Sequence, residues 1–329
     1  MKKVLITGGA GFIGYFLAKK MLDLNYEIHL ADNFSRGVKD KALLEIIKYD
    51  QVKLINTNIL DIQNLDNLDN DFHYIFHLAA IVGVKNVLNA PFDVLRNNNL
   101  LLNNMIDKAK QQKNLRRFIF ASTSEVYAGT LKDFGIKFPT PEDTPLSVGF
   151  KHDQRNTYMI SKIYGEYLCT HSGLPYTIIR PHNFYGPRMG LSHVIPEILK
   201  KAYESVNGLI DVYNVDHKRA FCYITDAIDI IYDIIESENS LNEIFNIGNE
   251  LDEVSIMDIA SIVINIVNNK LEVNSLIDSN NSPTRRCPSM NKVSKIINIR
   301  KPTSLQNGIA NCNKWYYENV FKEEGISAL

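Results

Sequence analysis

Short apolar runs alternate with longer amphipathic stretches along the first 180 residues of the chain. Short runs rich in Val, Ile and Phe are typical of strands that a sheet buries on both faces, and the periodic stretches between them have the length of helices. The alternation therefore predicts βαβ units around a parallel sheet. The expected strands are 3–7, 27–31, 52–56, 73–78, 117–121 and 176–180, and the expected helices are 12–24, 41–49, 91–109 and 158–171.

The alternation becomes less regular after Pro181, where short strands mix with helices. We therefore expect an α/β fold in which a Rossmann-type doubly wound parallel sheet fills residues 1–180. Residues 181–329 are expected to form a smaller, mixed α/β region that binds substrate, with some segments returning to the first sheet. In this second part the expected strands are 209–213 and 243–246, and the expected helices are 194–204, 225–236 and 255–267.

Composition narrows the classes of protein to consider. The 329 residues are 45% hydrophobic and 22% charged, which is enough apolar material for a sizeable core. The 36 Lys and Arg residues nearly balance 37 Asp and Glu residues, for a formal net charge of −1. Nucleic-acid binders usually carry a basic excess, so we expect no nucleic-acid partner. A local cationic pocket for one phosphorylated small molecule remains compatible with this balance.

The cysteines and the N-terminal residues indicate the cellular compartment of the protein. The four cysteines lie far apart and form no Cys-x-x-Cys pair, which favours free thiols in a reducing compartment over a disulfide framework or zinc site. Residues 1–7 lack the long apolar region of a signal peptide, and no apolar run approaches the roughly 20 residues of a membrane span. We therefore expect a cytoplasmic protein with no membrane partner and no catalytic metal.

A glycine-rich turn, TGGAGFIG, follows the first expected strand and opens the first expected helix. Gly8 permits a tight turn, Gly11 lets a pyrophosphate approach the backbone, and Gly14 lets the helix pack close to the sheet. The helix begins with Phe12 and Ile13. This N-terminal end of the helix offers free N–H groups and a positive dipole to phosphates. A plain β–α turn is the alternative interpretation, but the strand, the helix and a later acidic residue all favour dinucleotide binding.

That acidic residue, Asp32, ends the second expected strand. A carboxylate there accepts hydrogen bonds from the adenosine ribose and repels a 2′-phosphate, which favours NAD over NADP. Arg36 argues in the other direction, because an arginine in this loop can hold a 2′-phosphate.

Tyr158 and Lys162 are four residues apart and therefore share one face of an expected helix. A free phenol has a pKa near 10, and a neighbouring ammonium lowers this value by stabilising phenolate. We therefore expect Tyr158 to take a proton from a substrate hydroxyl and Lys162 to support it, also holding the nicotinamide ribose. The Ser/Thr-rich end of the fifth strand, which includes Thr123, lies between the two motifs at the edge where doubly wound sheets bind ligands.

These motifs together resemble the extended short-chain dehydrogenase/reductases, specifically the NAD-dependent nucleotide-sugar epimerases and dehydratases, along nearly the whole chain. The resemblance implies NAD as cofactor, a nucleotide-diphosphate sugar as substrate and a homodimer. It implies catalytic roles for Thr123, Tyr158 and Lys162. It also implies cofactor contacts from Asp32 and Asn33, Asp61 and Ile62, the HLAA segment with Leu78, Ala79 and Ala80, Asn98 and Pro181, and substrate contacts from Thr123, Asn183, Arg188, Val194 and Arg219. Arg286 is a further candidate for substrate binding.

The shared first step that the resemblance implies is oxidation of the sugar C4 hydroxyl, and the fate of the 4-keto sugar stays open. We expect an epimerase, in which the 4-keto sugar takes the hydride back on its other face. A UDP-glucuronate decarboxylase or a 4,6-dehydratase is the alternative, with Glu125 as a second acid/base two residues past Thr123. A solvated charge or a capping contact is the structural interpretation of Glu125. A non-catalytic NAD-binding sensor is the remote alternative.

Two further features of the sequence lie outside these motifs. Arg285 and Arg286 suit anionic oxygens, yet they also fit a surface pair in a proline-flanked loop. The stretch 129–143 is additional to the family pattern, and we expect it to reshape the sugar pocket.

Overall fold

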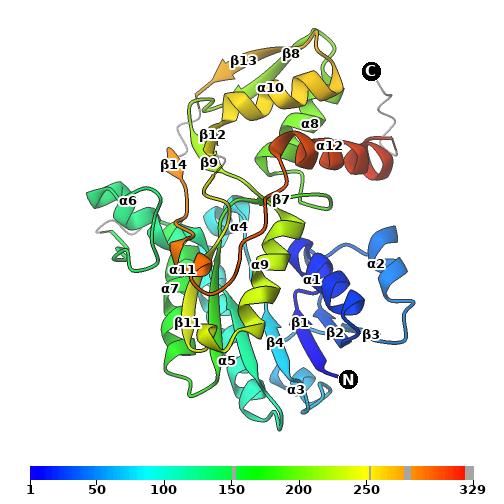
Figure 1. Ribbon diagram of the computed structural model, residues 1–329, viewed down its shortest axis with the longest axis vertical. Helices are drawn as coiled ribbons and strands as arrows, with labels where there is room; N and C mark the ends of the chain where they lie inside the picture. Colours follow the sequence, from blue (N-terminus) through cyan, green and yellow to red (C-terminus); the bar gives the residue numbers. More distant parts are fainter. Residues whose placement is uncertain (150–152, 252, 278–282, 323–329) are drawn as a thin grey trace.

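The computed structural model describes residues 1–149, 153–251, 253–277 and 283–322. Its centre is a seven-stranded parallel sheet in the order β11-β6-β5-β4-β1-β2-β3 (Figure 1), as the sequence predicts for a doubly wound fold. The strand order reverses beside β1, so the carboxyl ends of β1 and β4 diverge there and open a crevice. The strands are β1 (Lys3–Thr7), β2 (Glu27–Asp32), β3 (Val52–Asn56), β4 (Tyr74–His77), β5 (Arg117–Ala121), β6 (Tyr176–Pro181) and β11 (Glu243–Ile247).

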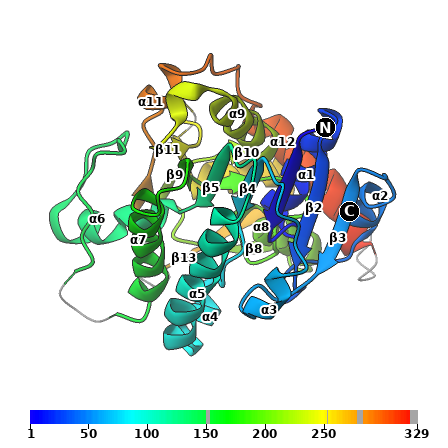
Figure 2. The ribbon, with the colours of Figure 1, turned by 90° about the horizontal axis from the view of Figure 1, so that it is seen from below.

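Helices cover both faces of this sheet, because its strands are apolar on both sides (Figure 2). Helix α1 (Phe12–Asp23) packs with α9 (Ile224–Glu236) on one face, where Leu17 and Ile231 belong to one buried cluster. Helices α5 (Pro91–Lys110) and α7 (Asn156–Thr170) pack side by side on the other face. The shorter helices are α2 (Lys41–Ile46), α3 (Ile62–Leu65), α4 (Val84–Asn89), α6 (Ala128–Phe134) and α11 (Asn291–Ser294); α2 and α11 share the buried cluster of α1 and α9, and α3 contacts α5.

Most of the later chain forms a second, smaller unit above the carboxyl edge of the sheet (Figure 1). It has its own buried cluster, which includes Leu199, Ile259 and Ile309. Strand β11 and helix α9 return to the first layer, since β11 pairs with β6 and α9 packs on α1. The unit contains α8 (Val194–Glu204), α10 (Ile256–Val267), α12 (Leu305–Tyr316), a π-helical turn (Tyr317–Phe321), and the short strands β7 (Phe184–Tyr185), β8 (Leu209–Tyr213), β9 (Lys218–Ala220), β10 (Cys222–Tyr223), β12 (Glu253–Ser255), β13 (Glu272–Leu276) and β14 (Arg285–Arg286).

Several expected element ends are wrong by one to three residues. The helix expected over 41–49 ends at Ile46, because Leu43 and Ile46 are its buried residues and the exposed Tyr49 has no core to pack against. The strand expected over 73–78 ends at His77. There the chain turns away toward Gly8, whose Cβ, if it had one, would lie 3.0 Å from the backbone nitrogen of Ala79.

Candidate active site

The glycine-rich turn forms an open cradle between β1 and α1. Gly8 has a positive φ of +71° and donates its N–H to the carbonyl of Ala31. A Cβ on Gly14 would clash with the carbonyl oxygen of Gly8, so only glycine allows this close packing. The N-cap residue of α1 is Gly11, which has no side chain to bond the first-turn N–H groups. These groups and the dipole of α1 fit a pyrophosphate, and Phe12 and Ile13 also line the cleft.

Asp32 lies at the carboxyl end of β2, next to this cradle. One carboxylate oxygen accepts the N–H of Ala10 at 3.0 Å and the other accepts the N–H of Phe34 at 2.8 Å. The side chain is therefore fixed in place and retains lone pairs for ribose hydroxyls. Asn33 and Arg36 line the same stretch of the cleft.

Asp61 and Ile62, which we expect on the adenine side of the cofactor, lie at the start of α3. Asp61 caps α3 by accepting the N–H of Gln63, and the side chain of Ile62 is 61% exposed. Neither residue lines the cleft, whereas Thr57, Asn58, Ile59 and Leu60 do. Contacts of Asp61 and Ile62 with a cofactor stay predictions.

The segment after β4 lines the middle of the cleft with Leu78, Ala79 and Ala80. Asn98 is not among the lining residues. Its side chain accepts the N–H of Ile81 and donates to the carbonyl of Ile81 and to the hydroxyl of Ser161. Asn98 therefore joins the segment after β4 to α7, close to the expected catalytic residues, and its contact with a cofactor stays a prediction.

Thr123, Tyr158 and Lys162 meet at the carboxyl edge of the sheet, where β5 ends beside α7. Lys162 donates to the carbonyl of Ala121 at 2.7 Å, and its Nζ lies 5.8 Å from the centre of the Tyr158 ring. Burial lowers the pKa of Lys162 to about 8. The residues expected to carry the chemistry are thus together, and Pro181 lines the same cleft at the end of β6.

The expected lowering of the Tyr158 pKa by Lys162 is not found in this structure. Burial raises the pKa of Tyr158, the charge of Glu125 raises it further, and a hydrogen bond with Thr123 lowers it. Burial outweighs the hydrogen bond because a phenolate is poorly solvated in a closed site. The positively charged nicotinamide ring of oxidised NAD, if bound beside Tyr158, would lower the pKa of Tyr158 and so favour removal of a proton from the substrate. The ammonium of Lys162 would act in the same direction.

Glu125 faces the C-terminal unit rather than open solvent. It lies in the 3₁₀ turn Ser124–Tyr127, which Thr123 caps by accepting the N–H of Glu125. Its carboxylate accepts a hydrogen bond from Arg286 on β14 at 2.5 Å. In the parallel pairing of β14 with β9, Arg286 is opposite Arg219, and all three side chains line the cleft. The neighbouring Arg285 pairs instead with Glu253.

The other expected substrate residues differ in how they are placed. Val194 lines the cleft at the start of α8, and Asn183 donates its amide to the carbonyl of Ala220 without lining the cleft. Arg188 lines the cleft next to α1. Its guanidinium forms an ion pair with Asp40 at 2.6 Å, and Nη1 has no hydrogen-bond partner among the described residues. The contacts of these residues with a sugar nucleotide stay predictions.

The glycine cradle, Asp32, the pair of Tyr158 and Lys162, and the pair of Glu125 and Arg286 all border one cleft of about 2960 Å³ between the sheet and the C-terminal unit. Its lining also includes Trp315, Tyr316 and Asn319 of the last helical segment, which sequence reasoning did not connect with a site. Sequence reasoning also missed Glu166, one turn beyond Lys162 on α7. The regular spacing of Tyr158, Lys162 and Glu166 was the available signal for this residue.

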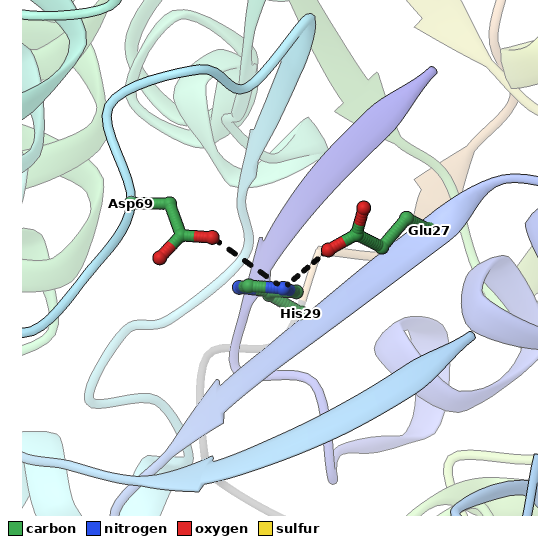
Figure 3. A group of neighbouring side chains, drawn as sticks. All are labelled: Glu27, His29 and Asp69. Carbon is green, nitrogen blue, oxygen red and sulfur yellow. Dashed lines mark hydrogen bonds and ion pairs between the residues drawn. The ribbon is translucent and has the colours of Figure 1, made fainter. Parts of the chain in front are cut away.

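One group of acidic and histidine side chains lies at the opposite, amino-terminal edge of the sheet. Nε2 of His29 is 3.1 Å from Glu27 and 3.8 Å from Asp69 (Figure 3). Nζ of Lys3 lies 3.3 Å from Glu27 and 2.8 Å from Asp69, so the group carries its own cation. It is the only such group of three potential metal ligands in the part of the chain that the structure describes, and none of its three members lines the cleft.

A Rossmann sheet with an open glycine cradle, a Tyr–Lys pair and a capping unit defines a nucleotide-cofactor enzyme of the short-chain dehydrogenase/reductase type. The model of the NAD dependent epimerase/dehydratase family matches residues 4–248, and the chain belongs to this family. Within the described residues, no helix has the length and apolar character needed to cross a membrane.

Individual relatives carry different activities. The UDP-N-acetyl-alpha-D-glucosaminuronate decarboxylase of Bacillus cytotoxicus is 34% identical over 234 residues, which cover 69% of each chain. The dTDP-D-glucose 4,6-dehydratase of Dictyostelium discoideum is 29% identical, over 71% of this chain and 55% of that protein. The crystal structure of UDP-glucuronic acid 4-epimerase from Bacillus cereus with UDP-glucuronic acid and NAD superposes with a TM-score of 0.83, at 26% identity, over 96% of this chain and 99% of that one.

Proposed function

We propose that the protein is an NAD-dependent epimerase of a nucleotide-diphosphate sugar that acts through a 4-keto intermediate. The observation that carries the proposal is the convergence of Thr123, Tyr158 and Lys162 in the same cleft as the glycine cradle. Bound NAD supplies the hydride acceptor and, later, the hydride donor. The phenol oxygen of Tyr158 accepts the proton of the sugar hydroxyl and returns one at the end, while Thr123 orients that hydroxyl.

The ion pair of Glu125 supports epimerisation over dehydration. Elimination of water requires a group that donates and accepts protons beside the sugar, in addition to Tyr158. In this structure the carboxylate of Glu125 accepts a hydrogen bond from Arg286 at 2.5 Å, so it acts there as an acceptor and not as a proton donor. Epimerisation needs no second acid, because the same hydride and the same proton return.

Decarboxylation of a nucleotide-diphosphate uronate is a second candidate. The observation that favours it is the 34% identity to a decarboxylase that acts, by name, on a UDP-linked uronate. Oxidation at C4 turns the sugar carboxylate into a β-keto acid, which loses carbon dioxide without an acid as strong as elimination requires. Both candidates therefore share the first step and the same residues, and they differ in what leaves the 4-keto sugar.

The cationic side chains of the C-terminal unit support a diphosphate ligand. Arg219 and Arg286 lie next to each other on β9 and β14 and line the cleft. Guanidinium groups suit phosphate oxygens because each can donate two parallel hydrogen bonds. UDP is the nucleotide that we test first, since the named relatives of both candidate activities use it.

We also propose a cytoplasmic location, which the four free, buried cysteines support.

The test is a product assay on the NAD-loaded protein with UDP-glucose, UDP-N-acetylglucosamine, the corresponding uronates, and GDP-, CDP- and dTDP-sugars. A product of unchanged mass with an inverted C4 signal by NMR is expected. Loss of carbon dioxide would instead establish the second candidate, and loss of water would establish a dehydratase. Absence of any product, together with absence of the 340 nm absorbance of reduced cofactor, would contradict catalysis and favour a sensor.

A further inference from the structure

The ion pair between Glu125 and Arg286 joins the two halves of the molecule across the cleft. Glu125 belongs to the turn after β5, and Arg286 belongs to β14 of the C-terminal unit, 161 positions away. We propose that Glu125 and the diphosphate of the sugar nucleotide compete for Arg286. Substrate binding then replaces an internal carboxylate with phosphate oxygens and frees Glu125 to accept a hydrogen bond from the sugar. This inference rests on the proposed function.

The first support is the charge around Arg219. Burial lowers the pKa of Arg219 to about 9, and the charge of Arg286 lowers it further, while Glu125 and Glu253 raise it. The two guanidinium groups are strand neighbours, so they repel each other unless an anion lies close to both. In this structure Glu125 supplies that negative charge. A diphosphate brings more negative charge than one carboxylate and can displace it.

The second support is the position of Glu125 relative to the catalytic phenol. Glu125 donates its N–H to the hydroxyl oxygen of Thr123 at 3.2 Å, and its charge raises the pKa of Tyr158, so the residue lies toward the reacting end of the cleft. Its side chain is 36% exposed and that of Arg286 is 20% exposed, so ligand atoms can reach both members of the pair. The pair therefore lies where a sugar and its diphosphate would meet, rather than behind the site.

The third support is the fixed backbone around Arg286. Thr140 donates its N–H to the carbonyl of Cys287, and Ser289 donates its N–H to the carbonyl of Thr140, each at 2.8 Å. Arg285 binds both carboxylate oxygens of Glu253 at 2.7 Å. These contacts hold β14, so Arg286 can exchange partners by rotating its side chain. They also give the stretch 129–143 a role, because Thr140 ties it to the strand that carries Arg286.

The test measures binding of UDP to the NAD-loaded protein by calorimetry, with inorganic pyrophosphate as a second probe that lacks the base. In Glu125→Gln the competitor is gone, and we expect UDP to bind about two- to fivefold more tightly, the range of a partly exposed ion pair. Arg286→Gln should weaken binding, and in the double variant the gain from Glu125→Gln should disappear. Glu243→Gln is the matched control, since it breaks the solvent-exposed pair with Lys292 outside the cleft and should leave UDP affinity unchanged.

Unchanged or weaker UDP binding in Glu125→Gln, with a thermal transition like that of the wild type, would overturn the inference. A gain in UDP affinity that persists in the double variant of Glu125→Gln and Arg286→Gln would also overturn the inference, because the gain would then come from the general loss of negative charge. Failure of the wild type to bind UDP, GDP, CDP or dTDP would overturn the proposed function itself. Glu125→Ala repeats the measurement without the amide, in case glutamine keeps a hydrogen bond to Arg286.

Discussion

The carboxylate of Glu166 accepts two hydrogen bonds from the guanidinium of Arg180, at 2.8 and 2.7 Å, with both side chains almost completely buried. Glu166 lies on α7 two turns beyond Tyr158, and Arg180 lies near the end of β6. The same carboxylate accepts the hydroxyl of Ser122, the neighbour of Thr123. One ion pair therefore holds the helix that carries Tyr158 and Lys162 against the strand end that carries Thr123.

Breaking this pair should destabilise the protein strongly. Glu166→Gln leaves the Arg180 guanidinium, with only 4% of its side chain exposed, without its counter-charge. We expect a loss of about 3–5 kcal/mol in the free energy of unfolding, measured by urea titration. Glu45→Gln is the control, because Glu45 and Lys48 form a solvent-exposed pair and its loss should cost less than about 0.5 kcal/mol. A similar small effect at Glu166 would contradict the role given to the pair.

Tyr158→Phe should remove hydride transfer and leave cofactor binding intact. The substitution takes away only the hydroxyl that exchanges the proton, so we expect a fall in kcat of about 10²–10⁴-fold. Tyr164→Phe on the same helix is the matched control, because Tyr164 is exposed and outside the cleft. Turnover by the Tyr158 variant at the wild-type rate would remove Tyr158 from the mechanism, whichever reaction the product assay identifies.

The outer faces of α5 and α7 carry large apolar side chains, and we predict that two copies of the chain associate through them. Phe92 and Leu100 on α5 are exposed, as are Tyr164 and Tyr167 on α7. The two helices lie side by side (Figure 2), so these side chains can form one patch of the kind that dimers cover. Analytical ultracentrifugation should give a dimer, and Leu100→Glu combined with Tyr167→Glu should give a folded monomer. A wild-type monomer at high concentration would contradict the prediction.

The local parts of the site were predictable from the sequence, because residues close in the chain create them. The turn from Gly8 to Gly14 and the pair Tyr158 and Lys162 depend on spacing within one turn or one helix. The segment after β3 shows the limit of this reasoning: that Thr57, Asn58, Ile59 and Leu60 line the cleft depends on how the chain packs after β3, and no local pattern encodes it.

Contacts between distant segments were not predictable from one sequence. Glu125 and Arg286 were each noted as candidates with two interpretations, and only the fold shows that they bind each other. The pKa of Tyr158 was predicted in the wrong direction for a related reason. Its spacing from Lys162 was visible, whereas the burial that outweighs this effect comes from the strands and helices packed around it.

His77 and His182 should make the folded protein sensitive to acid. Burial lowers the pKa of each to about 3, with a further decrease from Lys162 at His77 and from Arg286 and Arg180 at His182. The unfolded chain, with histidine pKa values near 6.5, binds more protons between pH 3 and 6.5, so stability is complete above this window and decreases as pH falls. Each histidine contributes about 2 kcal/mol of loss between pH 7 and pH 5.

Urea titrations of the wild type and of His77→Asn at several pH values check this expectation. Asparagine keeps a polar partner for the hydroxyl of Thr7, which lies 3.0 Å from Nδ1 of His77, but it does not titrate. The variant should be destabilised by a constant amount above pH 7 and should lose less stability than the wild type between pH 7 and pH 5. Parallel curves through that range would show that His77 is not protonated on unfolding, and the acid sensitivity would then have to come from other groups.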